Sequence, residues 1–119
     1  MSAAKKETVK KVKPYPITAT LELNSLKRDV EIIYVTTLGA VIRVVNGMVF
    51  VGEYYQLAFQ IPVTRESIVT QVRVLKTYDK VLSPEAKAVE RGAELHFQAL
   101  TPEHKSRIVA FIKAIGQDK

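Results

Sequence analysis

Apolar and polar residues alternate along most of the chain from residue 17 onward. Successive side chains of a β-strand point to opposite faces, so a period of two predicts strands with one buried face. We expect strands at residues 17–23, 29–36, 40–45, 55–61, 68–78 and 94–98. The pattern therefore predicts an all-β fold.

Two short polar segments between these strands are typical of tight turns. Asn24-Ser25 follows the first strand and indicates a turn into the second. Asn46-Gly47 is the dipeptide preferred in type I′ hairpins, because both central residues of that turn need a positive φ. We therefore expect a hairpin at Asn46-Gly47, continued by a short segment at residues 48–51.

A terminal helix is predicted where the period changes to that of an α-helix. Thr101-Pro102 provides an N-cap and a first helical residue, and Gly116 provides a stop. Between them the apolar positions have i, i+3, i+4, i+7 spacing, at Ile108, Phe111, Ile112 and Ile115. Six short strands followed by such a helix predict a six-stranded antiparallel barrel capped by a C-terminal α-helix.

The segment at residues 79–91 is longer than a barrel needs between two strands. Ser83-Pro84 resembles a helix start and Gly92 a helix stop, so we expect one or two helical turns over residues 85–90. An insertion of this kind on a barrel surface is a candidate contact element for another protein.

The composition is that of one soluble globular domain: 119 residues, 47% hydrophobic and 25% charged. The net charge of +6 is unevenly placed, because residues 1–13 carry five lysines and one glutamate and so account for +4 of it. Pro14-Tyr15-Pro16 then enforces an extended backbone. We expect a flexible basic arm at residues 1–13 and a nearly neutral barrel domain at residues 14–119, which makes nucleic-acid binding an unfavoured function.

Several classes of protein are disfavoured by what the sequence lacks. There is no cysteine, which excludes disulfides, thiolate nucleophiles and cysteine metal sites, and the two histidines, His96 and His104, supply a metal site poorly. The carboxylates are scattered and the glycines isolated, so no catalytic constellation or phosphate loop is formed and we expect no enzyme activity and no cofactor. There is no signal-peptide pattern and no apolar run of membrane-spanning length, so we expect a cytoplasmic location without membrane insertion.

The order and spacing of several short runs resemble the PilZ domain family over roughly residues 15–115. The runs that carry the resemblance are Leu38-Gly39-Ala40-Val41-Ile42-Arg43-Val44, Gly52 before Leu57-Ala58-Phe59-Gln60-Ile61-Pro62, Val72-Arg73-Val74, Gly92-Ala93-Glu94-Leu95-His96-Phe97, and the helix with Ile108 and Phe111-Ile112. The resemblance implies a bacterial six-stranded barrel with a C-terminal helix. Many PilZ domains are receptors for cyclic-di-GMP, so this nucleotide is the ligand that the resemblance suggests.

The family's two ligand motifs are altered in this chain. The D/N-x-S-x-x-G turn falls on residues 34–39, where Gly39 is kept, Thr36 supplies the hydroxyl, and Tyr34 replaces the acid or amide. The R-x-x-x-R motif ahead of the first strand is matched only by Lys6 and Lys10. Lysine lacks the planar fork with which arginine binds phosphate and stacks on a base, and tyrosine cannot accept two hydrogen bonds from guanine.

The resemblance and the basic arm together give three functional hypotheses. In the favoured one, the protein is a degenerate PilZ module that has lost the nucleotide and signals by contact with a bacterial protein partner, whose identity the sequence does not indicate. In the second, it is a cyclic-di-GMP receptor that uses the lysine arm together with Thr36 and Gly39. In the third and weakest, the basic arm binds nucleic acid.

Overall fold

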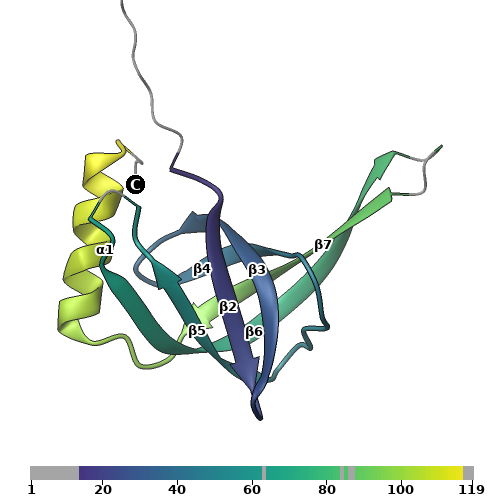
Figure 1. Cartoon of the computed structure of the whole chain (residues 1–119), viewed down its shortest axis with the longest axis horizontal. Coiled ribbons are helices and arrows are strands. Elements are labelled where there is room, and N and C mark those ends of the chain that lie inside the picture. Colours follow the sequence, from purple (N-terminus) through teal and green to yellow (C-terminus); the bar gives the residue numbers. More distant parts are fainter. Residues whose placement is uncertain (1–13, 63, 84, 86–87, 117–119) are drawn as a thin grey trace, which may run out of the picture.

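The computed structural model describes residues 14–62, 64–83, 85 and 88–116 of the chain. Six strands form one closed antiparallel barrel in the order β2-β3-β4-β7-β6-β5 (Figure 1). The strands are β2 (Ile17–Leu23), β3 (Leu26–Val35), β4 (Gly39–Val44), β5 (Tyr54–Gln60), β6 (Ser67–Ser83) and β7 (Ala88–Phe97), followed by the helix α1 (Pro102–Ala114). The six-stranded barrel with one C-terminal helix that the pattern predicted is confirmed.

The barrel interior is filled by the alternate apolar residues of each strand. In β5, for example, Tyr55, Leu57 and Phe59 are buried while Tyr54, Gln56 and Gln60 are exposed. On β6 the predicted inward series is also confirmed, because Ile68, Thr70, Val72 and Val74 are all buried. Burial of these side chains is the main favourable contribution to the stability of the fold.

Of the two predicted turns, one is confirmed and one is wrong. Asn24 and Ser25 both have positive φ, at 55° and 68°, and connect β2 to β3. After β4, however, residues 46–50 form no strand. The backbone N–H groups of Val45 and Asn46 both donate to the carbonyl of Asp29, and the side chain of Asn46 donates to the Asp29 carboxylate at 2.8 Å. These contacts fasten Asn46 to β3, so the chain leaves the sheet instead of folding back as a hairpin.

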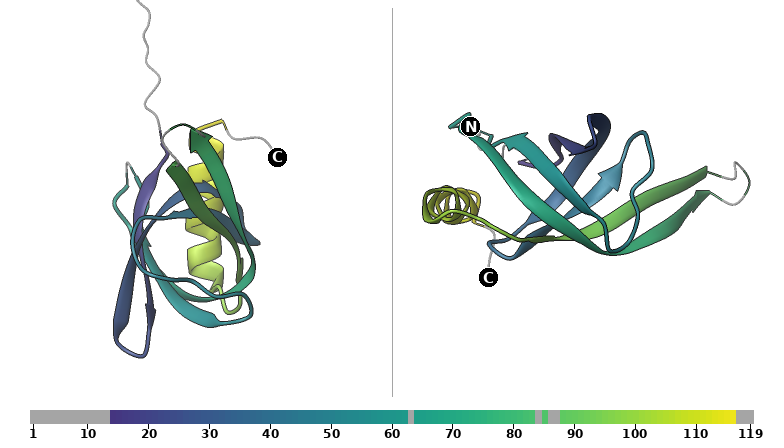
Figure 2. Two further views of the ribbon diagram at one scale, coloured as in Figure 1. Left: turned by 90° about the vertical axis from the view of Figure 1, so that its right-hand side faces the viewer. Right: turned by 90° about the horizontal axis from the view of Figure 1, so that it is seen from below.

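The predicted helical turns at residues 85–90 are wrong at residues 88–90, which belong to β7, because β6 and β7 continue as a long two-stranded arm. Residues 84, 86 and 87 of this prediction lie outside the described residues. The two strands pair from Val72↔Phe97 to Ser83↔Ala88 and project beyond the barrel, on the side away from α1 (Figures 1 and 2). Gly92 is a strand residue here, and the ring of Tyr78 covers it from the paired strand. An aromatic ring over a glycine stabilises strand pairing at that position, which favours the extended form over a helix.

The helix α1 begins and ends as its sequence predicts. Thr101 is the N-cap, and its side chain accepts a hydrogen bond from the backbone N–H of His104 at 3.1 Å. Ile108 and Phe111 are buried against the barrel core, whereas Ile112 and Ile115 are partly buried. The Nε of Arg107 lies 3.1 Å from a carboxylate oxygen of Glu66, which ties the helix to the segment between β5 and β6. The helix therefore packs as an integral layer of the domain.

Candidate functional site

The turn between β3 and β4 brings together Tyr34, Thr36 and Gly39, the three residues that the sequence assigned to a nucleotide-binding turn. Tyr34 is the penultimate residue of β3 and Gly39 is the first of β4. Lys6 and Lys10, the other two predicted site residues, lie outside the described residues, as does the whole arm at residues 1–13.

Thr36 organises the backbone of this turn. Its Oγ1 accepts hydrogen bonds from the N–H of Leu38 at 3.1 Å and from the N–H of Gly39 at 3.3 Å. Its own N–H donates to the carbonyl of Gly39 at 2.9 Å. A hydroxyl that satisfies two turn amides is a common local structure for threonine, so Thr36 has a structural role here without any ligand.

Gly39 is required by the close approach of β7. A Cβ at this position would collide with the backbone carbonyl oxygen of Leu95. Gly39 is paired with His96 in the sheet, and the N–H of Phe97 donates to the carbonyl of Leu38 at 2.9 Å. Backbone contacts of this kind hold the two strands at a separation that only glycine permits.

Tyr34 belongs to an aromatic group that includes Tyr15 and Phe111. The ring of Tyr15 lies 6.3 Å from that of Tyr34 and 6.1 Å from that of Phe111, the latter in an edge-to-face arrangement. The Tyr15 hydroxyl oxygen accepts a hydrogen bond from the N–H of Val35 at 3.3 Å. Burial of the Tyr15 ring raises the pKa of its phenol, an effect that the Val35 hydrogen bond opposes. The segment before β2 is thereby fixed against both the turn and the helix.

A shallow hollow of about 270 Å³ lies beside this turn, over the first residues of β4. The described residues that line it include no lysine or arginine, and Glu94 is their only carboxylate. Exposed apolar side chains border it, with Leu38 exposed by 69%, Leu75 by 46% and Tyr34 by 42%. The hollow offers apolar contact and a negative charge, which disfavours a phosphate group.

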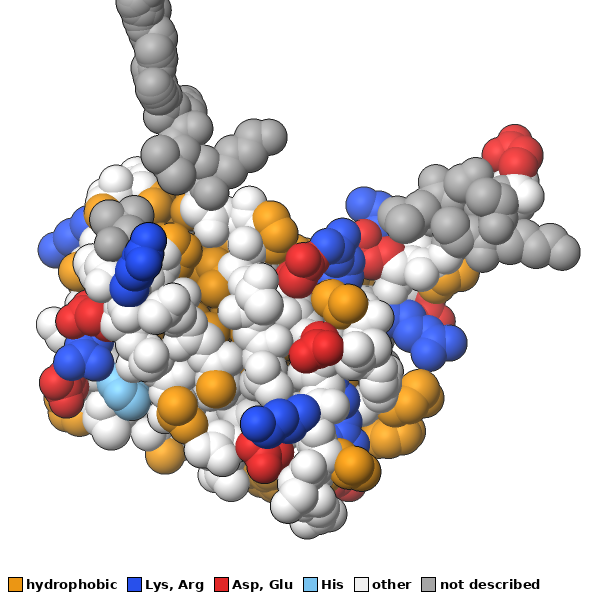
Figure 3. All heavy atoms as spheres, viewed as in Figure 1, with side chains coloured by type: hydrophobic (Ala, Val, Ile, Leu, Met, Phe, Trp, Pro, Cys, Tyr) orange, Lys and Arg blue, Asp and Glu red, His pale blue; other side chains and the backbone are white. Residues whose placement is uncertain are grey.

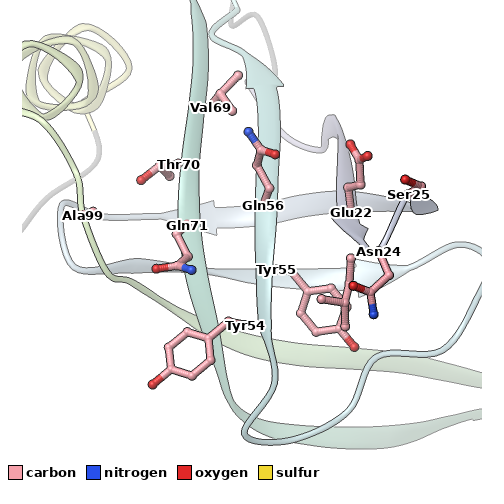
Figure 4. Close-up of a pocket in the computed structure, with 11 residues that line it drawn as sticks. Glu22, Asn24, Ser25, Tyr54, Tyr55, Gln56, Val69, Thr70, Gln71 and Ala99 are labelled. Carbon is pink, nitrogen blue, oxygen red and sulfur yellow. The ribbon is translucent and has the colours of Figure 1, made fainter.

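A second and larger hollow, of about 490 Å³, lies on β2, β5 and β6 away from this turn (Figure 4). Glu22, Gln56 and Gln71 form a row across it, because Glu22 is paired with Gln56 and Gln56 with Gln71. These are isolated polar groups on the outside of three strands.

The two histidines and the carboxylates do not assemble into a metal site among the residues that the structure describes. His96 is exposed, and its Nδ1 lies 3.3 Å from the side-chain nitrogen of Gln98. His104 lies in the first turn of α1. Within the described part of the chain, no helix has the length and apolar character needed to cross a bilayer.

One residue of the site, Tyr15, was not predicted from the sequence. The pattern placed Tyr15 only between two prolines at the boundary of arm and barrel, whereas in the structure it contacts the turn at Tyr34 and Val35. The signal available was an aromatic residue placed directly before the first strand, since a large ring at the mouth of a small barrel has apolar area to bury.

Comparison with solved structures identifies the fold. The PilZ domain with c-di-GMP of YcgR from Escherichia coli superposes with a TM-score of 0.72 at 8% identity, over 86% of this chain and 82% of that one. The Bacillus subtilis inhibitor of motility MotI/DgrA superposes with a TM-score of 0.69 at 12% identity, over 90% of this chain. This chain spans about half of MotI/DgrA, covering 51% of its length. The chain has a PilZ-like fold.

No protein-family model matches the sequence, and no curated protein matches it either. At 8% and 12% identity, the two superpositions are evidence about the fold only.

Proposed function

We propose that this protein is a non-catalytic signalling module that keeps the PilZ-like barrel, has a degenerate cyclic-di-GMP site, and acts through contact with another protein. One observation carries the proposal: Tyr34 occupies the acid or amide position of the turn motif, and its ring lies 6.3 Å from that of Tyr15. The turn therefore presents an aromatic surface where the family motif would present a hydrogen-bond acceptor.

The other motif residues support the same conclusion. Thr36 and Gly39 both have structural reasons to be present, since one satisfies turn amides and the other accommodates the Leu95 carbonyl. A receptor also needs directional contacts to guanine and phosphate, and this chain has lysines in place of the two arginines and Tyr34 in place of the acceptor. If each such contact is worth about 1–3 kcal/mol, three losses weaken binding by at least roughly a hundredfold.

The alternative function, a cyclic-di-GMP receptor, is favoured by one contact. Tyr15 lies against Tyr34 and Val35, so the chain that precedes residue 14 joins the barrel next to the turn. Residues 1–13, with their five lysines, therefore precede a segment that contacts the predicted nucleotide-binding turn at residues 34–39. The same arm supports a third and weaker candidate, nucleic-acid binding, through its charge of +4.

The remaining parts of the proposal rest on the sequence pattern and on the resemblance. Residues 14–119 form the barrel domain, and residues 1–13 are a basic arm attached to it. We place the protein in the bacterial cytoplasm, with a protein partner and no enzymatic activity of its own.

An amide titration tests which function holds. Cyclic-di-GMP is added to the ¹⁵N-labelled full chain, and GTP is added to a second sample as a control for general phosphate binding. The degenerate module predicts no saturable shifts at residues 34–39 in the micromolar range. Saturable shifts at these residues with cyclic-di-GMP and not with GTP would favour the receptor.

A further inference from the structure

The β6–β7 arm leaves one strand edge open along most of its length. On the side away from β7, β5 pairs with β6 only from Ser67 to Arg73. One further residue is bonded there, because the N–H of Val74 donates to the Glu53 carbonyl and the Val74 carbonyl accepts from the Gly52 N–H. Beyond Val74, no described strand pairs with this side of β6.

An open edge of this kind has a specific chemistry. Its backbone N–H and C=O groups form a template for a further strand, and six residues, 76–81, extend over roughly 20 Å. Addition of an extended segment to such an edge is a common mode of recognition, in which the backbone gives affinity and the alternate side chains give specificity. The side chains of residues 76–81 therefore indicate which segment fits.

The two faces of this edge differ in character. Lys76 and Lys80 are four residues apart, so they share one face of the strand, and both are exposed. The other face carries the exposed residues Thr77, Asp79 and Val81. Asp79 is paired with Arg91 and Val81 with Val89, and the two valine side chains are exposed by 61% and 50%. Near the base of the edge, Phe50 is 52% exposed. Charged side chains of both signs follow the arm (Figure 3).

The pairing of β6 with β7 shows which charges lie opposite Lys76 and Lys80. β7 sets Glu94 opposite Lys76 and Glu90 opposite Lys80. A strand added along the other side of β6 would stand next to the same two lysines. Opposite charges in adjacent strands are favourable and like charges are unfavourable, so an added strand fits best with acidic residues on this face and apolar residues on the other.

We propose that the open edge of β6, at residues 76–81, binds an extended segment of a partner protein in which acidic and apolar residues alternate. This inference rests on the proposed role as an interaction module and specifies the surface and the kind of partner. The acidic residues of the segment face Lys76 and Lys80, and its apolar residues pack toward Val81.

A second copy of the chain fits this edge less well. Two β6 edges related by a two-fold axis could pair most of residues 76–81 in registers centred on Tyr78 or Asp79. The first register sets Lys76 opposite Lys80, and the second sets Asp79 opposite Asp79. Each therefore brings like charges together, which disfavours self-association in favour of an acidic partner.

The first test uses two synthetic octapeptides with blocked termini, one alternating valine and glutamate and the other valine and lysine. Each is titrated into the ¹⁵N-labelled full chain. We expect saturable shifts at residues 75–81 with the glutamate peptide, at least tenfold slower hydrogen exchange at the amides on the open edge, and neither effect with the lysine peptide. Shifts confined to residues 1–13, or no shifts on β6, would overturn the proposal.

The second test exchanges the charges. The variant Lys76→Glu/Lys80→Glu should bind the glutamate peptide at least tenfold more weakly and should bind the lysine peptide instead. The matched control Lys27→Glu/Lys105→Glu changes the net charge equally at two exposed lysines on β3 and α1, and should bind as the natural chain does. Equal losses in both variants would mean general charge attraction and would contradict the proposal.

The proposal stays testable if the charge-exchange variant does not fold, and its test is independent of the cyclic-di-GMP titration. If Lys76→Glu/Lys80→Glu does not fold, the comparison of the two peptides on the natural chain decides alone. Peptide binding at residues 76–81 is also measured independently of cyclic-di-GMP binding, which is tested at residues 34–39. Nucleotide binding there would contradict the proposed function, whereas failure of the glutamate peptide would contradict only the strand-edge proposal.

Discussion

The ring of Tyr34 packs beside the ring of Tyr15, with 6.3 Å between their centroids and 34° between their planes. This contact joins the β3–β4 turn to the segment that precedes β2. Tyr34 stands where the PilZ turn motif has an acid or amide, so the contact places an aromatic pair at that position. The pair therefore connects the altered sequence motif to the proposed loss of nucleotide binding.

Substitutions that complete the PilZ ligand motifs should create or strengthen cyclic-di-GMP binding. The triple variant Tyr34→Asp/Lys6→Arg/Lys10→Arg regains a carboxylate for the guanine edge and two planar forks for phosphate and stacking. We expect its affinity for cyclic-di-GMP, measured by calorimetry, to exceed that of the natural chain by at least tenfold. The combined variant should gain most, because the three contacts act on one ligand.

A matched control for this repair places the carboxylate elsewhere. Tyr54→Asp combined with the same two arginines has an identical composition, and Tyr54 is exposed on β5, away from the turn. This control should gain less affinity than the Tyr34 variant, because it has the two arginines without a carboxylate at residue 34. An equal gain in both triple variants would show that the carboxylate at residue 34 does not contact the ligand.

The two glycines packed against neighbouring strands should respond differently to alanine. The methyl group of Gly39→Ala would collide with the carbonyl of Leu95, part of a paired backbone that cannot move without breaking the sheet. The atoms nearest to the methyl group of Gly92→Ala belong to the Tyr78 ring, a side chain that can move. We expect Gly39→Ala to lower the free energy of unfolding by about 3 kcal/mol or more, and Gly92→Ala to lower it less. If urea unfolding shows a larger loss of stability for Gly92→Ala than for Gly39→Ala, a structural role for Gly39 is refuted.

Loss of the Phe111 ring should destabilise the whole domain. Phe111 is 6% exposed and packs edge-to-face on Tyr15, so Phe111→Ala leaves a cavity between helix and barrel. A buried phenylalanine-to-alanine change costs about 3–5 kcal/mol, a large share of the stability of a small domain. Lys113→Ala, on an exposed position of the same helix, is the control. An unchanged urea midpoint for Phe111→Ala would show that the helix does not dock.

Alkaline conditions should weaken the fold through two tyrosines. Burial raises the pKa of both Tyr15 and Tyr78, and the carboxylates of Glu90 and Glu94 raise that of Tyr78 further. The unfolded chain, with tyrosine pKa values of about 10, then loses these protons first, so stability should decline as the pH rises above about 10. The decline in urea midpoint with rising pH should be less steep for Tyr78→Phe than for the natural chain. Equal slopes in the two proteins would contradict the contribution of Tyr78.

The barrel and its helix could be predicted from the sequence because local signals and burial agree there. The alternation in β2 and β5 and the spacing of Ile108 and Phe111 each match one buried face. The errors occur where a contact distant in sequence decides the local structure. Asn46 bonds to Asp29, seventeen residues earlier, and Gly92 lies under Tyr78 of the paired strand. Neither contact is visible in a short window of sequence.

The candidate site was predictable only in part for a similar reason. The turn at residues 34–39 could be located from its spacing, and the hydroxyl and glycine are placed together as the motif predicts. The structural reasons for Thr36 and Gly39 depend on backbone geometry that the motif does not specify. The role of Tyr15 depends on how the chain enters the barrel. Sequence can therefore indicate a ligand motif without showing whether its residues serve the fold instead.

The central claim, that the nucleotide site is degenerate, is tested most directly by calorimetric titration of the full natural chain with cyclic-di-GMP at physiological salt. We expect no binding in the micromolar range, because Tyr34 and the lysines of the arm lack the directional contacts that guanine and phosphate require. A dissociation constant at or below about 1 μM would contradict it and establish the receptor function instead.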